Sequence, residues 1–197
     1  MFDRYSGVVA VAALVLGLMD AAAAQAAGTN TFQLQSSAFA PNGNIPPKFT
    51  CEGKNVSPPL SWSSAPAKTQ SYALIVEDPD APKGPVTHWL MFNIPAKLTA
   101  LPDATALPPN AKDGLNSANA KGYHGPCPPS GKHHYVFTLY ALDAMLNIAS
   151  PSTKAQLQTA MTSHVLAQAT LTGLYEKQKP KQPTRDDIVN ARASRPK

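Results

Sequence analysis

The chain has 197 residues, of which 43% are hydrophobic and 15% are charged. This length supports one domain with a substantial core. The 20 prolines and 11 glycines argue against a helical bundle, because both residue types interrupt helices. The net charge of +5 is concentrated in residues 176–197, where seven Lys and Arg outnumber three acidic residues. The rest of the chain is nearly neutral, so the basic net charge of the protein does not predict nucleic-acid binding.

The N-terminal segment is typical of an export signal. Its apolar run from Val8 to Met19 is too short to span a membrane, and small residues follow it. We therefore expect a signal peptide over residues 1–24, with cleavage after Ala24 or Ala26. The mature protein would then be periplasmic or secreted, with no stable membrane span. An uncleaved amphipathic anchor is the alternative.

The remaining chain divides into a folded domain over residues 25–175 and a basic tail over residues 176–197. The tail is rich in Pro, Lys and Gln and has few apolar residues, so we expect it to be disordered. It would serve either as a solubilising extension or as a surface-binding arm.

The first part of the domain predicts short strands separated by turns. Thr31–Gln35 alternates polar and apolar residues, which is the period of a half-buried strand. Lys48–Cys51 is expected to form a short edge strand and Leu60–Trp62 another. Asn, Gly and Pro residues between these segments favour turns.

Two strand-like runs at the centre of the chain, Tyr72–Val76 and Trp89–Ile94, flank a polar loop. The unbroken apolar character of the first run predicts a strand that is buried on both faces. Asp78 precedes a proline, which holds it extended. The loop is therefore expected to bring Asp78, Asp80 and His88 together at the ends of the two strands.

The C-terminal half predicts one long strand, one helix and a last strand. Residues 98–121 form a long loop, and the alternation in His133–Leu142 places His133 and Tyr135 on one face. Ser150 followed by Pro151 is a helix-start signal, so a single amphipathic helix is expected over residues 152–166. Residues 169–175 can form one more strand. Many strands with a late helix indicate a mostly-β domain.

Three separated motifs resemble those of the phosphatidylethanolamine-binding protein family. They are CEGKNVSPPLSW at 51–62, DPDAP with the later THW at 78–89, and GYHGPCPPSGKHHYVFTLYALD at 122–143. The likeness covers roughly residues 31–175 and is closer to the bacterial Raf kinase inhibitor-like branch. It implies a β-sandwich of two antiparallel-rich sheets with one or two C-terminal helices.

The resemblance also implies a small pocket that accepts phosphate, acetate or a phospholipid headgroup. The positions carried over to this chain are Asp78, Asp80, His88, Gly125, Cys127, Pro129, His133 and Tyr135. His and Tyr can donate hydrogen bonds to an anion, and an Asp can orient a His. His134 is expected to point away from the face of Tyr135. In the loop at 125–131, the prolines leave only Gly125, Cys127, Ser130 and Gly131 with backbone N–H groups.

We therefore expect an exported binding protein for a small anion, phosphate ester or phospholipid headgroup, with no cofactor. Some members of the family inhibit kinases or proteases, which implies a possible protein partner at the rim of the pocket. Two alternatives use the same Asp, His and Tyr side chains. A metal site could form from Asp78, Asp80, His88 and His133, although no HxxxH or CxxC spacing supports it. A hydrolase would need a nucleophile, and no GxSxG motif is present.

Cys51 and Cys127 are the only two cysteines of the chain. In an exported protein such a pair is expected to form a disulfide. The resemblance places both beside the same pocket, so the bond would fix the loop at 125–131 against the segment that precedes Trp62. Two free thiols are the alternative.

Overall fold

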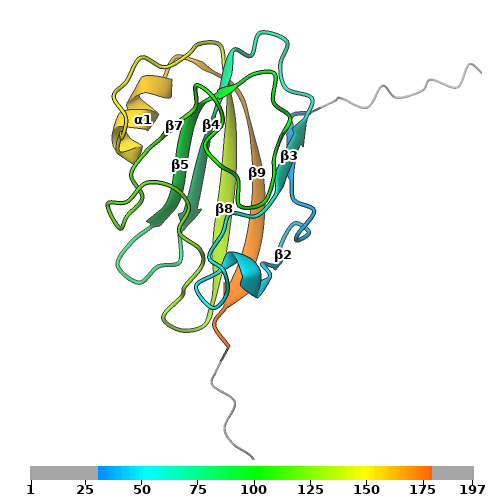
Figure 1. Cartoon of the computed structure of the whole chain (residues 1–197), viewed down its shortest axis with the longest axis vertical. Helices are drawn as coiled ribbons and strands as arrows, with labels where there is room; N and C mark the ends of the chain where they lie inside the picture. The colour runs from blue at the N-terminus through cyan, green and yellow to red at the C-terminus, as the bar shows by residue number, and fades with distance from the viewer. Residues whose placement is uncertain (1–30, 179–197) are drawn as a thin grey trace, which may run out of the picture.

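The computed structural model describes residues 31–178 and shows a two-sheet β-sandwich with one α-helix in that range. The larger sheet has six strands in the order β2-β9-β8-β4-β5-β7, and the smaller sheet has the order β1-β3-β6 (Figure 1). All pairings are antiparallel except that of β2 with β9. The element bounds are β1 Gln33–Gln35, β2 Gly43–Asn44, the 3-10 helix η1 Pro47–Phe49, β3 Leu60–Ser63, β4 Ser71–Asp78, β5 Val86–Pro95, β6 Ala100–Leu101, β7 Lys112–Asp113, β8 Lys132–Leu142, α1 Lys154–Met161 and β9 Val165–Glu176. The mostly-β, two-sheet expectation is confirmed.

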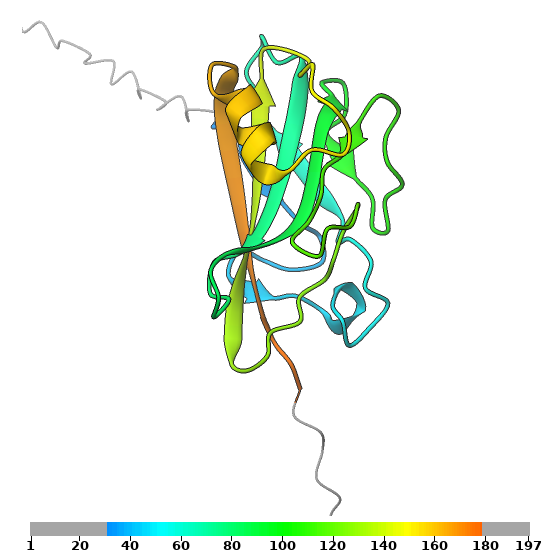
Figure 2. The same ribbon diagram turned by 90° about the vertical axis from the view of Figure 1, so that its left-hand side faces the viewer.

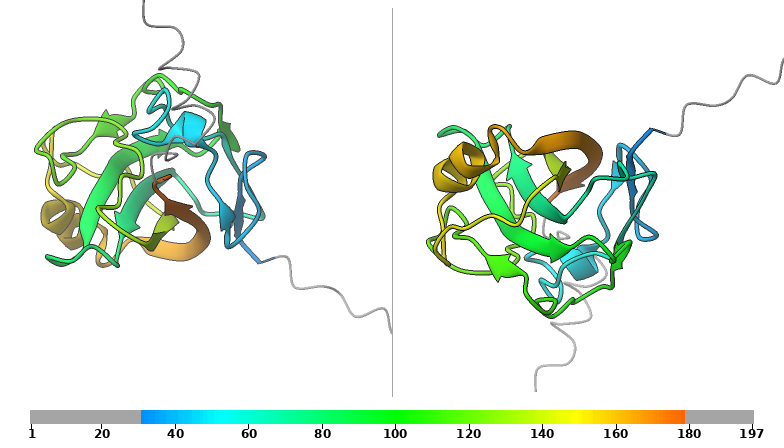
Figure 3. Two further views of the ribbon diagram at one scale, coloured as in Figure 1. Left: turned by 90° about the horizontal axis from the view of Figure 1, so that it is seen from below. Right: turned by 90° about the horizontal axis from the view of Figure 1, so that it is seen from above.

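The domain has three layers, with the large sheet in the middle. Views along the strands show α1 on one side of the large sheet and strands β1 and β3 of the small sheet on the other (Figure 3). Figure 2 shows α1 lying against the face of the large sheet. Because both faces are covered, β4 is buried along almost its whole length, as its unbroken apolar run predicted.

Alternate residues of the central strands enter two separate cores. The core between the sheets contains Leu74, Val76, Trp89, Met91, Phe137 and Leu139. The core under α1 contains Ala73, Ile75, Leu90, Phe92, Leu157 and Met161. Burying each large apolar side chain contributes roughly 1.5–3 kcal/mol, so both layers stabilise the sheet. Beyond Val76 and Phe137, the inter-sheet face of β4 and β8 continues into polar residues, and these form the candidate site.

The expected edge strand at Lys48–Cys51 is wrong, because residues 47–49 form the 3-10 helix η1. Pro46 and Pro47 fix the φ angles at its start, and Pro47 has no N–H group to contribute to a strand. The Pro47 carbonyl accepts hydrogen bonds from both the backbone N–H and the hydroxyl of Thr50. These local bonds close the turn and bring Cys51 to its disulfide partner.

The helix is shorter than the expected range of 152–166. It starts after Thr153, which forms a capping box with Gln156, and not after Ser150. It ends at Met161, and Val165 already pairs with Leu142 of β8. Long-range pairing with β8 therefore overrides the helical spacing of the apolar residues. His164 lies past the helix and hydrogen-bonds Asp143.

The remaining boundaries differ slightly from expectation. The first strand covers Gln33–Gln35, and the long loop at 98–121 contains the two-residue strands β6 and β7. The last strand ends at Glu176, one residue past the expected domain end. No helix within residues 31–178 is long and apolar enough to cross a membrane. The predicted signal peptide and residues 179–197 of the predicted tail lie outside the described residues.

Candidate functional site

Asp78 and His133 form a buried pair at the adjoining ends of β4 and β8. The distance from His133 Nδ1 to Asp78 Oδ2 is 2.7 Å, and the two side chains are 8% and 5% exposed. The other carboxylate oxygen of Asp78 accepts the backbone N–H of Asp80 at 2.9 Å. Because Nδ1 donates to the carboxylate, the free nitrogen of His133 is Nε2.

His88 reaches the same face through a β-bulge. Val76 pairs with Trp89, whereas the next residue of β4, Glu77, pairs with Thr87, so His88 is an extra residue in β5. Strict alternation along β5 would point His88 to the face of the sheet that α1 covers, opposite to the face of Trp89. The bulge instead lets His88 pack edge-on against the Tyr135 ring, with 5.1 Å between ring centroids. Bulges re-aim side chains in this way and are common beside functional sites.

The imidazole of His88 is held in one tautomer by the chain. Its Nδ1 lies 2.6 Å from the carbonyl oxygen of His124, and the His124 N–H donates back to the His88 carbonyl. Burial lowers the pKa of His88, which outweighs the opposing effect of this hydrogen bond. At neutral pH His88 is therefore uncharged, with its proton on Nδ1 and a lone pair on Nε2.

The Tyr135 hydroxyl is buried and forms no hydrogen bond of good geometry within the described residues. Burial and the nearby Asp78 carboxylate raise its pKa, and the backbone of Cys127 lies beside it. An unpaired buried hydroxyl is costly unless a ligand or a water molecule satisfies it. The arrangement therefore leaves a donor available next to His88. We call Asp78, His88, His133 and Tyr135 the Asp–His–Tyr cluster.

Asp80 lies at the surface and faces His134 rather than the cluster. Its Oδ2 accepts both the backbone N–H and Nδ1 of His134, each at 2.7 Å. The backbone hydrogen bond is the main cause of the lowered pKa of Asp80. His134 points away from the face of Tyr135, as expected from strand alternation. Of the two predicted carboxylates, only Asp78 joins the cluster.

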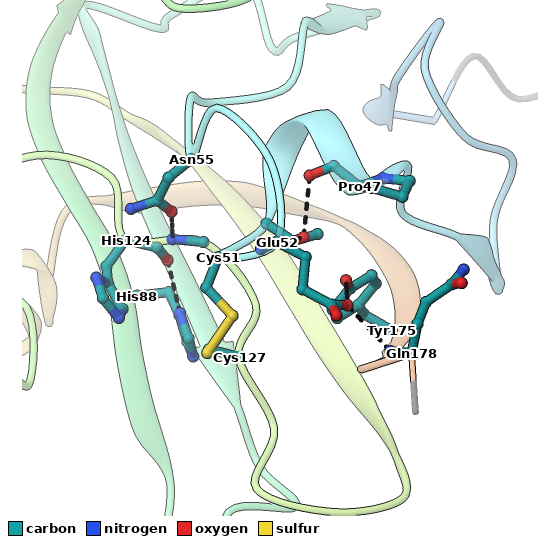
Figure 4. The surroundings of a disulfide bond; sticks show 11 residues. Pro47, Cys51, Glu52, Asn55, His88, His124, Cys127, Tyr175 and Gln178 are labelled. Atoms are coloured by element: carbon teal, nitrogen blue, oxygen red, sulfur yellow. Dashed lines mark hydrogen bonds between the residues drawn. A yellow bond between two sulfur atoms is a disulfide. The ribbon is translucent and has the colours of Figure 1, made fainter. Parts of the chain in front are cut away.

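The loop before β8 is fastened to the segment after η1. A disulfide joins Cys51 to Cys127 with 5.4 Å between their Cα atoms, so the expected pairing is present (Figure 4). The N–H of Gly125 donates to Asn55 Oδ1 at 2.7 Å and is not free for a ligand. Gly125 itself is required, because a Cβ would lie 2.5 Å from that Asn55 oxygen.

The outer residues of this loop lie at the surface, and two of them, His124 and Cys127, adjoin the cluster. Pro129 and His124 are exposed, and the His124 ring stacks on His88 with 5.9 Å between centroids. Cys127 is exposed as well, although its sulfur is occupied by the disulfide. Of the predicted loop residues, Cys127 thus offers only its backbone to a ligand and Pro129 only a surface contact.

Two supporting contacts were not predicted from the sequence. Asn55 fastens Gly125, and Glu52 accepts hydrogen bonds from the Tyr175 hydroxyl and the Gln178 N–H (Figure 4). The turn-like run Glu52–Asn55 has no periodicity that would reveal these partners. The Asn55 contact positions the loop, whereas the Glu52 contacts join the segment after η1 to the end of β9.

The cluster is nearly closed, since none of its four residues is more than 6% exposed. Surface cavities lie elsewhere, for example beside Trp89 and Asp113 and beside α1. Within residues 31–178, no group of three or more His, Cys, Asp or Glu side chains is arranged to hold a metal ion. A ligand would reach the cluster with a small polar group, not with its bulk.

Known proteins share both the sequence and the fold. The sequence profile of the family described as phosphatidylethanolamine-binding protein matches residues 35–176. A UPF0098 protein of Methanothermobacter thermautotrophicus is 48% identical over 148 residues, which cover 73% of this chain and 98% of that protein. The crystal structure of a phosphatidylethanolamine-binding protein homologue from Chlamydia trachomatis superposes with a TM-score of 0.73, at 42% identity, over 76% of this chain and 100% of that one. Escherichia coli YbcL, described as a new member of the mammalian family, gives a TM-score of 0.70 at 35% identity, over 75% and 99%.

Proposed function

Because the chain belongs to the phosphatidylethanolamine-binding protein family, we propose that it binds a small anion or phosphate ester at the Asp–His–Tyr cluster. Three polar atoms carry this proposal: Nε2 of His88, Nε2 of His133 and the hydroxyl of Tyr135. The two Nε2 atoms have no hydrogen bond to another described residue, and the Tyr135 hydroxyl is itself buried without a partner of good geometry. Because buried polar atoms normally have partners, this unpaired hydroxyl beside two histidine nitrogens supports a ligand site at the cluster.

The protonation of the cluster defines the chemistry of the ligand. His88 at neutral pH presents a lone pair at Nε2, which repels a fully ionised oxyanion. A phosphate monoester has a second pKa of about 6, so it can bring the missing proton with it or leave it on the imidazole. Either route places one proton between His88 and a phosphate oxygen. The Tyr135 hydroxyl can then donate to a second oxygen.

Asp78 has a supporting role in this proposal. Its carboxylate fixes the tautomer of His133 so that Nε2 faces the ligand. A carboxylate in direct contact with an anion would repel it, but both Asp78 oxygens already accept hydrogen bonds from the chain. Asp78→Asn would therefore act on binding through the orientation of His133.

The proposal is tested by isothermal titration of the protein with inorganic phosphate and phenyl phosphate. His88→Ala and Tyr135→Phe should each weaken binding by about tenfold or more, because a hydrogen bond to a charged group contributes about 1.5–3 kcal/mol. His134→Ala is the matched control, since His134 is exposed on the opposite face of β8 and should leave the affinity unchanged. Unchanged affinity in both cluster variants would place the binding site elsewhere.

The exposed residues next to the cluster motivate a second part of the proposal, namely a role as an inhibitor-like modulator of a kinase or protease. His124 stacks on His88 and the backbone of Cys127 lies beside Tyr135, so a protein partner that covers the cluster would contact these two exposed residues. Hydrolysis of the bound ester is the enzymatic alternative, with neutral His88 as a base. Turnover of 4-nitrophenyl phosphate that is lost in His88→Ala would favour the enzyme over the binding protein.

A further inference from the structure

A surface cavity lies beside Trp89, Asp113 and Tyr123. It has a volume of about 250 Å³. Its walls come from β5, β7 and three loops, and they include Asn55, Trp89, Met91, Leu107, Asp113 and Tyr123. This volume is somewhat below that of pockets for drug-sized ligands, so the cavity suits only a small molecule. None of the four cluster residues lines it.

Aromatic side chains form one wall of this cavity. Trp89 and Tyr123 pack edge to face with 5.6 Å between ring centroids. The Tyr123 hydroxyl is already used, because it donates to the Phe49 carbonyl at 2.8 Å. Tyr123 therefore offers its ring to the cavity, and Met91 adds a polarisable thioether. Such a wall favours apolar groups and cations over anions.

Asp113 supplies the one carboxylate among the residues that line the cavity. Its backbone is fixed in β7, where it pairs with Met91. Its carboxylate has no hydrogen bond or ion pair with any residue from 31 to 178, although the residue is partly buried. Burial raises the pKa of Asp113, and the positive charge of Lys121 opposes this effect. A desolvated carboxylate without a partner is costly, and a bound cation would offset that cost.

We propose that the cavity bounded by Asp113, Trp89 and Tyr123 binds a small organic cation of the alkylammonium or quaternary ammonium class. The carboxylate neutralises the positive charge, and the ring of the partly exposed Tyr123, which packs on the buried Trp89, contacts the alkyl groups around the nitrogen through cation–π interactions. Anions are excluded by Asp113. This site is separate from the anion site and does not depend on it.

Substitutions of Asp113 and of Lys121 should change the affinity for a cation in opposite directions, and this tests the proposal. The Lys121 ammonium group acts on Asp113 through its charge and therefore competes with a bound cation. The full chain is titrated with tetramethylammonium chloride at constant ionic strength, with sodium chloride as the blank. Binding is followed by calorimetry and by the NMR signal of the Trp89 indole N–H. Asp113→Asn should weaken binding by about tenfold, whereas Lys121→Gln should strengthen it.

Asp143→Asn is the matched control, because Asp143 is a carboxylate paired with His164 outside the cavity. It should leave the affinity for tetramethylammonium unchanged. Asp113→Asn should also keep the far-UV circular dichroism spectrum of the unsubstituted protein, which shows that the variant is folded. The proposal is overturned if tetramethylammonium perturbs Trp89 no more than sodium does. It is equally overturned if Asp113→Asn and Lys121→Gln bind like the unsubstituted protein.

Discussion

At the scale of single residues, the buried histidine His88 has consequences for stability. Its pKa in the folded protein is lowered by burial, below the ordinary value of 6.5. In the unfolded chain the same imidazole takes up a proton as the pH falls past that ordinary value. The folded state binds this proton less tightly than the unfolded state does, so acidification stabilises the unfolded state relative to the folded one. The contribution of His88 is present above pH 6.5 and is lost as the pH falls towards the folded pKa.

We therefore predict that the free energy of unfolding of His88→Gln depends less steeply on pH than that of the unsubstituted protein. Gln can still donate to the His124 carbonyl but does not titrate. As the pH falls below about 6.5, the free energy of unfolding of His88→Gln should fall less than that of the unsubstituted protein, by up to about 1.4 kcal/mol per pH unit. Urea unfolding at several pH values measures the difference, with His134→Gln as the exposed control. Parallel pH profiles for His88→Gln and the unsubstituted protein would contradict the lowered pKa.

At the scale of elements, the disulfide joins the segment after η1 to the loop before β8. Cys51 and Cys127 are 76 positions apart, so the bond closes a long loop in the unfolded chain. Hydrogen bonds already hold the two segments together in the folded state, from Gly125 to Asn55 and from Cys51 to Pro126. The disulfide therefore acts mainly by restricting the unfolded chain rather than by shaping the site.

We predict that reduction lowers the free energy of unfolding by about 4 kcal/mol, from the chain-entropy argument for a loop of this length. Urea unfolding with and without dithiothreitol measures this change. The double variant Cys51→Ala/Cys127→Ala should be insensitive to dithiothreitol and serves as the control. Thiol counting on the denatured, unreduced protein should find no free thiols. Two reactive thiols per chain would show that the pair is not bridged.

The local alternation of polar and apolar residues predicts side-chain orientation correctly where strand pairing is regular. The alternation in β8 correctly assigned His133 to the buried face and His134 to the surface, because β8 pairs without a bulge along that segment. The bulge at His88 was not predictable, because it depends on the register between β4 and β5 rather than on the residues of β5 alone. The helix was predicted too long for a similar reason. The residues after Met161 fit a helical period, but pairing with β8 makes them a strand.

At the scale of the whole molecule, the layers explain why one end of the sheet is polar. The inter-sheet core fills the middle of the sandwich, and β4 and β8 continue past it to Asp78 and His133. There the loop with the disulfide covers the sheet in place of the small sheet (Figure 4). Polar side chains thus lie at the edge of a well-packed core, where they are fixed in position. The fold was predictable from three motifs. The position of the loop that covers the cluster was not, because it depends on contacts such as that of Asn55 with Gly125.

The last prediction concerns the compartment in which the molecule functions. Two sequence features support export: the apolar run from Val8 to Met19 and the small residues that follow it. The Cys51–Cys127 disulfide is a further argument, because structural disulfides persist mainly in oxidising compartments. We propose that the chain is exported and that the mature protein begins at Gln25 or Ala27.

Cell fractionation followed by N-terminal sequencing of the soluble protein tests this proposal. Leu16→Arg should block export, because a charge interrupts the apolar run that the export machinery recognises. Ser194→Arg adds the same charge to the C-terminal tail and should be exported normally. A soluble protein that still begins at Met1 or Phe2 would contradict the proposal. In that case the disulfide would have to form without export, and thiol counting on protein taken directly from the cytoplasm would show whether it does.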